Sequence, residues 1–339
     1  MKLKTLYHYL FVVCISVSLS GCLTLGTLEI EVVKPSKITL PSTINSVLII
    51  NNCLLNHPDS FKNEVQKGLY NLDTTTTQIL VQQVNGLLNE SPRFDTSILI
   101  SKIFFRKQQD IMQPIQWNAI QQLGAKYNVD AILSLEAFGI NDTIIAYTAY
   151  DGFGYSTYSN LALVANSMWR IYLVNDEKIL ERSIQRDTLV LWEITSKKDY
   201  LKALSEAAMI NYLAENLSAT MSLKIADRIA PYWQPVQRDF FIYGNKEMQI
   251  AAQYAYKDNW RAAALIWKSF TDHENKRLSG AACHNMALVC EVEGKLDIAE
   301  KWLIQALEKY NNNISHEYLK QIRIRIKESK QLDSQFGIE

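Results

Sequence analysis

The C-terminal part of the sequence repeats with an offset of 36 residues, and this feature constrains the fold more than any other. The segment MQIAAQYAYKDNWRAAALIWKSF (248–270) is matched by HNMALVCEVEGKLDIAEKWLIQAL (284–307), so that Ala251 aligns with Ala287, a difference of 36 positions. Apolar and small residues recur at spacings of three and four in both segments, which is typical of amphipathic helices. From Gly244 onward the periodicity is helical throughout, and we predict an all-α domain over residues 244–335.

The second segment resembles the tetratricopeptide repeat (TPR), in which small residues let two antiparallel helices approach closely and a glycine forms the turn between them. The first segment departs from that pattern: the period is two residues longer than the family's, Asp258 replaces the turn glycine and Phe270 replaces the last small residue. The residues expected to pack the repeats are Ala251, Ala263, Ala287, Gly294, Ala299 and Ala306.

The repeats are expected at about 245–271 and 279–310, with a capping helix at 315–331. The TPR resemblance implies that first-helix residues line a groove, which makes Gln249 and Asn285 the candidate groove residues. Two repeats do not bury a continuous core, since about three are needed. The alternative is therefore that the repeats support the N-terminal domain rather than bind a partner.

Residues 36–243 alternate between strand-like and helix-like segments. The run INSVLIINN (44–52) is β-branched and apolar, as a buried strand is, and VDAILSLEAFGI (129–140) predicts a second strand directly after a helix. The runs 161–174 and 178–192 predict a hairpin, and 200–229 predicts one long helix. The fold class is therefore α+β, a mixed α/β N-terminal domain followed by an all-α TPR-like helical repeat domain.

The first 21 residues have the three parts of an export signal. Lys2 and Lys4 precede the apolar run 10–19, which is too short to span a bilayer. The sequence Leu19-Ser20-Gly21-Cys22 resembles a bacterial lipobox.

That resemblance implies cleavage before Cys22, covalent diacylglycerol on its sulfur and a tether at 22–35. No Asp follows Cys22, which by the lipoprotein sorting pattern favours the outer membrane, and the same stretch lacks the acidic cluster typical of surface display, which favours the periplasmic face. Multiple acyl chains hold a protein on a membrane for practical purposes permanently.

The net charge argues against a nucleic-acid-binding protein, and the number of cysteines argues against a disulfide-linked scaffold. Residues 1–21 contain two lysines and no acidic residue, so the processed chain has 33 Lys+Arg (35 minus 2) against 35 Asp+Glu. This balance argues against a nucleic-acid partner, which requires a concentrated basic patch. Besides Cys22 the processed chain has Cys53, Cys283 and Cys290, an odd number that gives no disulfide framework. We expect these three to be small buried apolar residues.

The sequence has no catalytic motif. It lacks the phosphate-binding loop, the G-x-S-x-G elbow, H-E-x-x-H and C-x-x-C. No histidine in the processed chain has a partner at metal-ligand spacing. We therefore predict a protein that is not an enzyme and binds no cofactor or metal.

An aromatic, glycine-rich segment at 146–160 contains Tyr147, Tyr150, Phe153, Tyr155 and Tyr158. Tyrosine gives a large contact area at low entropic cost, so these residues are candidates for a recognition surface. Tyrosines spaced two or three apart between strands are also typical of one face of a hairpin, and the structural interpretation is the favoured one.

As a whole the chain resembles a family of uncharacterised Gram-negative bacterial lipoproteins with an N-terminal α/β domain and a C-terminal TPR-like tail. The resemblance rests on the lipobox, INSVLIINN, VDAILSLEAF, KIADRIAPYW and the 36-residue repeat. More distantly, residues 40–230 resemble, in element order, curli-secretion and penicillin-binding-protein activator lipoproteins.

These features favour a non-enzymatic adaptor that binds an unknown envelope protein through its TPR-like helices. The alternative is an envelope assembly or secretion component that oligomerises through the α/β domain. The sequence leaves a homo-oligomer open.

Overall fold

The computed structural model describes residues 25–53, 63–100, 113–150, 152–191, 197–242 and 244–338. By their contacts these residues form two compact units. The α/β unit contains residues 33–233 and the C-terminal residues from Gln331, and the helical unit contains residues 234–330 and the N-terminal residues up to Val32. No helix in the described part of the chain is long and apolar enough to cross a membrane.

The α/β unit is built on a five-stranded sheet with the order β3-β2-β4-β5-β6. Strand β2 pairs in parallel with β3 and β4, whereas β5 is antiparallel to both β4 and β6. The elements of this unit are β2 (Ser46–Asn51), α2 (Glu64–Glu90), β3 (Thr96–Ile100), α3 (Trp117–Tyr127), β4 (Ala131–Tyr150), β5 (Tyr155–Leu173), β6 (Lys178–Leu191), α4 (Lys197–Ser205) and α5 (Ala207–Ile229).

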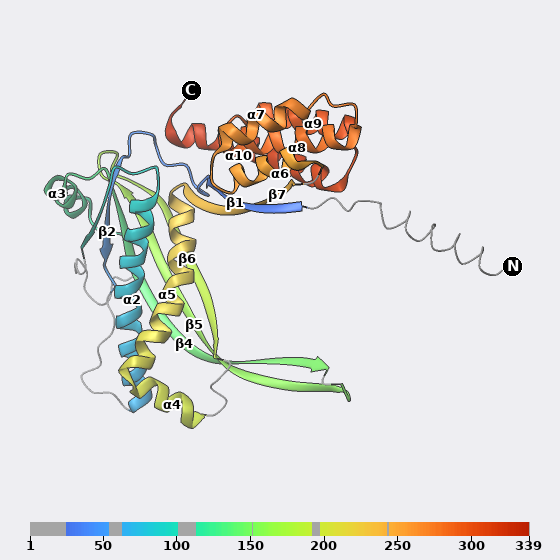
Figure 1. The fold of residues 1–339 in the computed structure, drawn as a ribbon. Coiled ribbons are helices and arrows are strands. Elements are labelled where there is room, and N and C mark those ends of the chain that lie inside the picture. Colours follow the sequence, from blue (N-terminus) through green and yellow to red (C-terminus); the bar gives the residue numbers. More distant parts are fainter. Residues whose placement is uncertain are drawn as a thin grey trace. The chain divides into compact units, whose positions relative to one another are not determined.

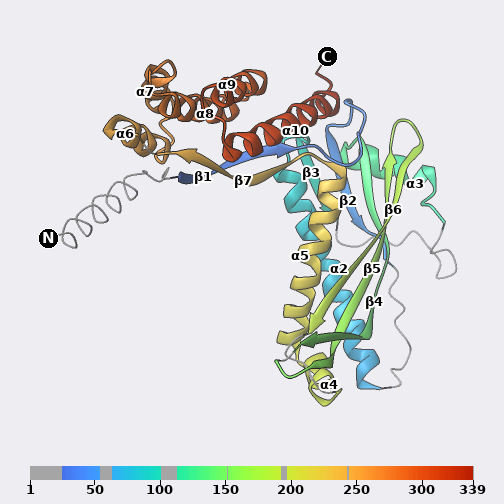
Figure 2. The ribbon, with the colours of Figure 1, turned by 90° about the vertical axis from the view of Figure 1, so that its right-hand side faces the viewer.

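Two apolar cores lie on opposite faces of this sheet. Helices α2 and α5 cover one face, where buried leucines of both helices meet Leu133, Leu135 and Trp169. Helix α3 covers the other face, around Leu48 and Ile132 (Figures 1 and 2). The predicted strand at 44–52 is β2, which is buried along its length because it lies between two strands and under helices on both faces.

Local hydrogen bonds and backbone angles set the boundaries of two helix regions, α2 and α4–α5. Helix α2 begins at Glu64, where Asn63 accepts a hydrogen bond from the backbone N–H of Gln66 (3.0 Å). The predicted single helix 200–229 is two helices, because Glu206 has extended backbone angles. The Ser205 hydroxyl donates to the carbonyl of Lys202 at 2.7 Å and so competes with the helical pattern at this break.

The helical unit contains five helices among the described residues and a two-stranded sheet of β1 and β7. Its elements are β1 (Leu25–Lys34), β7 (Tyr232–Phe241), α6 (Lys246–Ala255), α7 (Trp260–Phe270), α8 (Lys276–Val292), α9 (Leu296–Lys309) and α10 (Asn313–Phe336). The ends of β1, β7 and α10 extend into the α/β unit as defined by contacts. Residues 25–34, predicted as part of a tether, are a strand because Ile30 and Val32 alternate into the core beside Phe240 and Phe241.

The 36-residue offset has a structural counterpart. Equivalent alanines in α6 and α8, and in α7 and α9, are fully buried. The turn between the helices of each pair has a residue with positive φ at the same position, Asp258 at 56° and Gly294 at 73°. The buried alanines are Ala251, Ala287, Ala263, Ala299 and Ala306.

Candidate interaction site: a β-ribbon, its buried anchor and an occupied groove

Strands β4 and β5 extend beyond the rest of the sheet. They pair from Ala131↔Leu173 to Tyr150↔Tyr155. Strand β2 follows β4 only as far as Leu135, and β6 leaves β5 at Leu161. Residues 145–160 therefore form a ribbon of two strands in the described part of the chain, which we call the distal ribbon (Figure 1).

The distal ribbon exposes aromatic side chains and has a single charged residue, Asp151. Phe153 is fully exposed, Tyr155 and Tyr150 are 82% and 65% exposed, and Tyr147 is 40% exposed. The rings of Tyr150 and Tyr155 contact each other edge to face, with 5.5 Å between centroids. Natural exposed edges usually contain charged residues or proline, which prevent pairing with another chain. This ribbon has almost none, so it is a surface suited to contact with another molecule.

Asp73 of helix α2 binds strand β4 just before the distal ribbon begins. The carboxylate of Asp73 accepts a hydrogen bond from the backbone N–H of Ile140 at 2.9 Å. Burial raises the pKa of Asp73 to about 7, which the hydrogen bond from Ile140 only partly opposes. The base of the ribbon is thus held by a carboxyl group whose charge changes near neutral pH.

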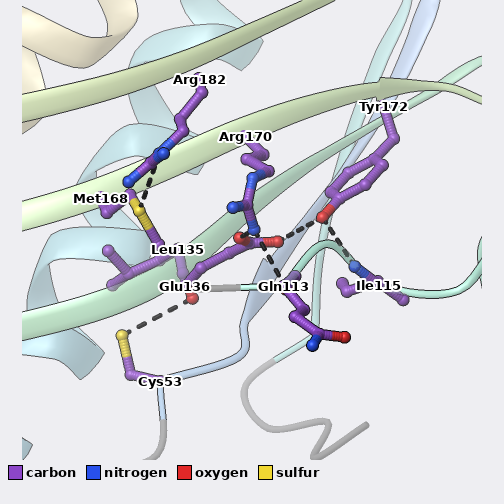
Figure 3. A network of polar contacts seen from close by, with 9 residues as sticks. All are labelled: Cys53, Gln113, Ile115, Leu135, Glu136, Met168, Arg170, Tyr172 and Arg182. Carbon is purple, nitrogen blue, oxygen red and sulfur yellow. Dashed lines mark hydrogen bonds and ion pairs between the residues drawn. The ribbon is translucent and has the colours of Figure 1, made fainter. Parts of the chain in front are cut away.

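A second anchor is a β-bulge in β4. The register of β4 against β5 shifts between Leu135 and Ala137, which leaves Glu136 as the extra residue. Its carboxylate, buried, is bonded by the guanidinium of Arg170 and the hydroxyl of Tyr172, both on β5 (Figure 3). Within the described residues, the guanidinium of Arg170 offsets the negative charge of this carboxylate.

The same network holds the chain segment that leads into α3. Arg170 Nη1 donates to the carbonyl of Gln113 at 3.2 Å, and the N–H of Ile115 donates to the hydroxyl of Tyr172 at 3.0 Å (Figure 3). Burial, together with the charge of Glu136, raises the pKa of Tyr172 well above its ordinary value. The tyrosine therefore remains a neutral donor, and the network acts as a structural anchor.

Cys53 follows β2 and contacts β4 beside Glu136. Its thiol donates to the carbonyl of Leu135 at 3.6 Å (Figure 3). Cys53, Cys283 and Cys290 are all buried free thiols, as the sequence predicted. In the described residues no cluster of three or more His, Cys, Asp or Glu side chains could hold a metal ion.

The predicted groove of the helical unit is filled by strand β7. Asn285, predicted to line an open groove, is fully buried. Its side-chain carbonyl accepts from the N–H of Phe241 at 2.9 Å and its amide donates to the carbonyl of Phe241 at 2.7 Å. The adjacent His284 bonds the carbonyl of Asp239 at 3.0 Å. Asn285 thus binds the backbone of this chain itself, whereas Gln249, its equivalent, is exposed on α6.

A buried ion network fixes β7 to α8 and α10. Both carboxylate oxygens of Glu291 accept from Arg238 at 2.8 Å. Tyr318 and Arg325 donate to the same carboxylate at 2.6 Å. These hydrogen bonds and charges lower the pKa of Glu291 despite its burial, which on its own would raise it. The site therefore holds a carboxylate between two guanidinium groups.

We predicted neither glutamate network from the sequence, although the sequence contains a signal for the Glu136 network. Glu136 and Arg170 are the only charged residues in the long apolar runs 131–141 and 161–174, and a charge within a buried strand requires a partner.

The predicted lipobox, Leu19, Ser20, Gly21 and Cys22, lies outside the described residues, as does Asp151. The predicted packing alanines are fully buried in the helical unit, and Gly294, with positive φ, lies in the turn between α8 and α9.

A family model described as a domain of unknown function (DUF8603) matches residues 44–241. The chain belongs to this family. A second model, also a domain of unknown function (DUF6340), matches residues 249–328. Thus the DUF8603 match covers the five-stranded sheet, and the second match covers helices α6 to α10. Among curated proteins, none matches the sequence.

Three solved structures are similar to part of the DUF8603 chain. The PelC dodecamer from Paraburkholderia phytofirmans is 11% identical with a TM-score of 0.26, over 60% of this chain and 99% of that chain. A minor lipoprotein from Acinetobacter baumannii is 10% identical with a TM-score of 0.21, over 56% and 98%. Lipoprotein GNA1162 from Neisseria meningitidis is 15% identical with a TM-score of 0.18, over 50% and 98%. Similarity at this level assigns neither a function nor an assembly to the chain.

Proposed function

We propose that this protein is a lipid-anchored, non-enzymatic component of the bacterial envelope whose α/β unit makes protein–protein contacts through the distal ribbon. The observation that carries the proposal is the exposed aromatic surface of residues 145–160, which has one charged residue. Aromatic side chains supply most of the energy at protein interfaces, and charged residues are depleted there.

The anchor in this proposal is Cys22, on the evidence of Leu19-Ser20-Gly21-Cys22. The anchoring group proposed is covalent diacylglycerol on Cys22, and the location proposed is the outer membrane, on its periplasmic face. Substitution Cys22→Ser is expected to move the protein from the membrane fraction to the soluble periplasmic fraction. A Cys22→Ser protein that remains in the membrane fraction would contradict the anchor.

The occupied groove supports an assembly role over the adaptor role. An adaptor that binds through the helical unit needs a free groove, and β7 fills the position next to Asn285. The adaptor hypothesis keeps one supporting observation: Ile250 and Tyr254, one turn apart on α6, are partly exposed beside Gln249. In that case the helix pairs α6–α7 and α8–α9, which we propose to be TPR-like, would bind through the outer face of α6.

Site-specific photo-crosslinking in living cells tests the assembly role. A photoreactive residue is placed at Phe153 and, as a matched control, at Leu265, an exposed apolar residue of α7. We expect adducts at Phe153, with another copy of the chain or another envelope protein, and none at Leu265. Adducts at Leu265 alone, or at neither position, would overturn the proposal.

A further inference from the structure

A cavity of about 90 Å³ lies between the C-terminal ends of α2 and α5 and the first residues of β7, within the α/β unit. Its walls are mostly apolar, with Leu223 and Trp233 half exposed at the surface. Two carboxylates, Glu90 and Asp227, also line it, and no Lys, Arg or His does. The cavity therefore combines an indole ring with two negative charges.

The two helices add to the negative potential. Both point their C-terminal ends at the cavity, and a helix C-terminus is equivalent to about half a negative charge. The last turn of α2 contains no basic residue. The last turn of α5 contains Arg228, whose guanidinium is bonded to Glu181 of β6 (Nε–Oε1 2.6 Å).

The cavity is rigid at its floor. Ser91, the residue that ends α2, is buried and donates its hydroxyl hydrogen to the carbonyl of Pro231 at 2.5 Å. The N–H of Ala230 bonds to the carbonyl of Ala226 at 2.9 Å and closes the end of α5. These hydrogen bonds satisfy the Ser91 hydroxyl and the Ala230 N–H, and Glu90, Asp227 and Trp233 are the acidic residues and the indole of the lining.

Asp227 lacks full compensation for its burial. Burial raises its pKa, and the charge of the exposed Lys37 only partly opposes this. A further cation in the cavity would stabilise the ionised carboxylate.

We propose that this cavity binds the alkylammonium group of a small organic cation. An ammonium group with its methyl or methylene substituents matches a site that is apolar, aromatic and negative at once, because indole is the best cation–π partner. Mg²⁺ and Ca²⁺ take six or more oxygen ligands, and the apolar walls do not provide them. The phosphate of a zwitterionic lipid headgroup would meet two carboxylates and no cation in the lining, so the proposed ligand is a free organic ammonium ion rather than a lipid.

Choline and its neutral carbon isostere, 3,3-dimethylbutan-1-ol, are the probes for the experiment, with binding to the full chain measured by calorimetry. We expect saturable choline binding and at least roughly tenfold weaker binding of the isostere, the ratio that about 1.4 kcal/mol gives. Equal binding of the two would show an apolar cavity only and would overturn the proposal, as would an absence of binding.

Variants then locate the site. Trp233→Leu, Glu90→Gln and Asp227→Asn are each expected to weaken choline binding several-fold. Glu64→Gln, at the opposite end of the same helix α2 as Glu90, is the matched control and is expected to bind normally.

Two competition arms separate the alternative ligands. Displacement of choline by lower concentrations of Mg²⁺ would overturn the proposal in favour of a metal site. Displacement by phosphatidylcholine vesicles at lower headgroup concentrations would overturn it in favour of a lipid headgroup. The distal ribbon takes no part in this site. An absence of choline binding therefore does not contradict the proposed function, and an absence of crosslinks at Phe153 does not contradict the choline site.

Discussion

Each unit of this protein buries one glutamate between an arginine and a tyrosine, but the two networks balance charge differently. Among the residues that the structure describes, Glu136 of the α/β unit pairs with the guanidinium of Arg170. In the helical unit Glu291 pairs with two guanidinium groups, those of Arg238 and Arg325. The described Glu136–Arg170 pair has no net charge, whereas Glu291 with its two arginines has a net positive charge that favours the ionised carboxylate.

The difference corresponds to what each network holds. Glu136 joins two adjacent strands of the sheet at a bulge, in the part of β4 and β5 that precedes the distal ribbon. Glu291 joins a strand to two helices, so it holds β7 against α8 and α10. In the α/β unit the buried carboxylate joins two strands of one sheet, and in the helical unit it joins strand β7 to two helices.

Removal of either glutamate tests this comparison with the largest expected effect. Glu291→Ala leaves two guanidinium groups buried without their carboxylate, and Glu136→Ala leaves one. Loss of one partner of a buried pair costs about 3–5 kcal/mol of unfolding free energy. We expect Glu291→Ala to destabilise its unit more than Glu136→Ala does, measured by urea unfolding followed through amide NMR signals of each unit.

The control for this pair is Glu293→Ala, because Glu293 is exposed and its ion pair with Lys295 is also exposed. Exposed pairs contribute about 0–1 kcal/mol, so little change is expected. If Glu136→Ala cost as much as Glu291→Ala, the second arginine would have no effect and the comparison would fail.

The pH dependence of the two units should have opposite signs. Asp73 of the α/β unit has a folded pKa of about 7 against an ordinary 3.8, so the folded state binds the extra proton between these values. The stability of this unit therefore falls as pH rises through that window. His284 of the helical unit has a folded pKa of about 4 against 6.5, owing mainly to burial. The unfolded state binds the extra proton there, so the stability of this unit falls as pH decreases from 6.5 to 4.

One pKa unit corresponds to about 1.4 kcal/mol, so the effect is at most roughly 4.5 kcal/mol for Asp73 (from 3.8 to about 7) and roughly 3.5 kcal/mol for His284 (from 6.5 to about 4). The urea midpoints of the two units, measured from about pH 4 to pH 7, are expected to move in opposite directions. Asp73→Asn should remove most of the slope of the α/β unit and leave the helical unit unchanged. Midpoints that move together would show that other groups control both.

Local patterns in the sequence predict much of this fold. The β-branched run at 44–52 is a buried strand, and the 36-residue offset places buried alanines at equivalent positions in the helix pairs. Hydrophobic periodicity is a local property, and these elements are set by it. The Tyr- and Gly-rich segment at 146–160 is a hairpin, as the structural interpretation held.

The remaining features depend on contacts between residues distant in the sequence. The partner of β1 is β7, some 200 residues later, so residues 25–34 read alone look like a tether. The length over which β4 and β5 lack neighbours depends on where β2 and β6 end. Asn285 lies on α8, and the identity of the segment that it binds depends on the path of β7.

The smallest expected change in unfolding free energy is that of substitutions at Asn285 and Gln249, two positions 36 residues apart. They test whether β7 occupies the predicted groove. Asn285→Ala removes the partner of both the N–H and the carbonyl of Phe241, in a buried site. An unsatisfied buried group costs about 1–3 kcal/mol, and we expect a loss of roughly 2 kcal/mol in the helical unit. Gln249→Ala, at the equivalent but exposed position, should change stability by less than about 0.5 kcal/mol.

The same pair of variants separates a self-occupied groove from a binding groove. If the helical unit binds its own β7, Asn285→Ala increases amide exchange at Phe240 and Phe241, and Gln249→Ala does not. If Asn285→Ala left that exchange unchanged, β7 would be held by strand β1, His284 and the Glu291 network without Asn285. The hydrogen bonds of Asn285 would then be dispensable for the position of β7, and a groove closed by Asn285 would be the wrong description of this unit.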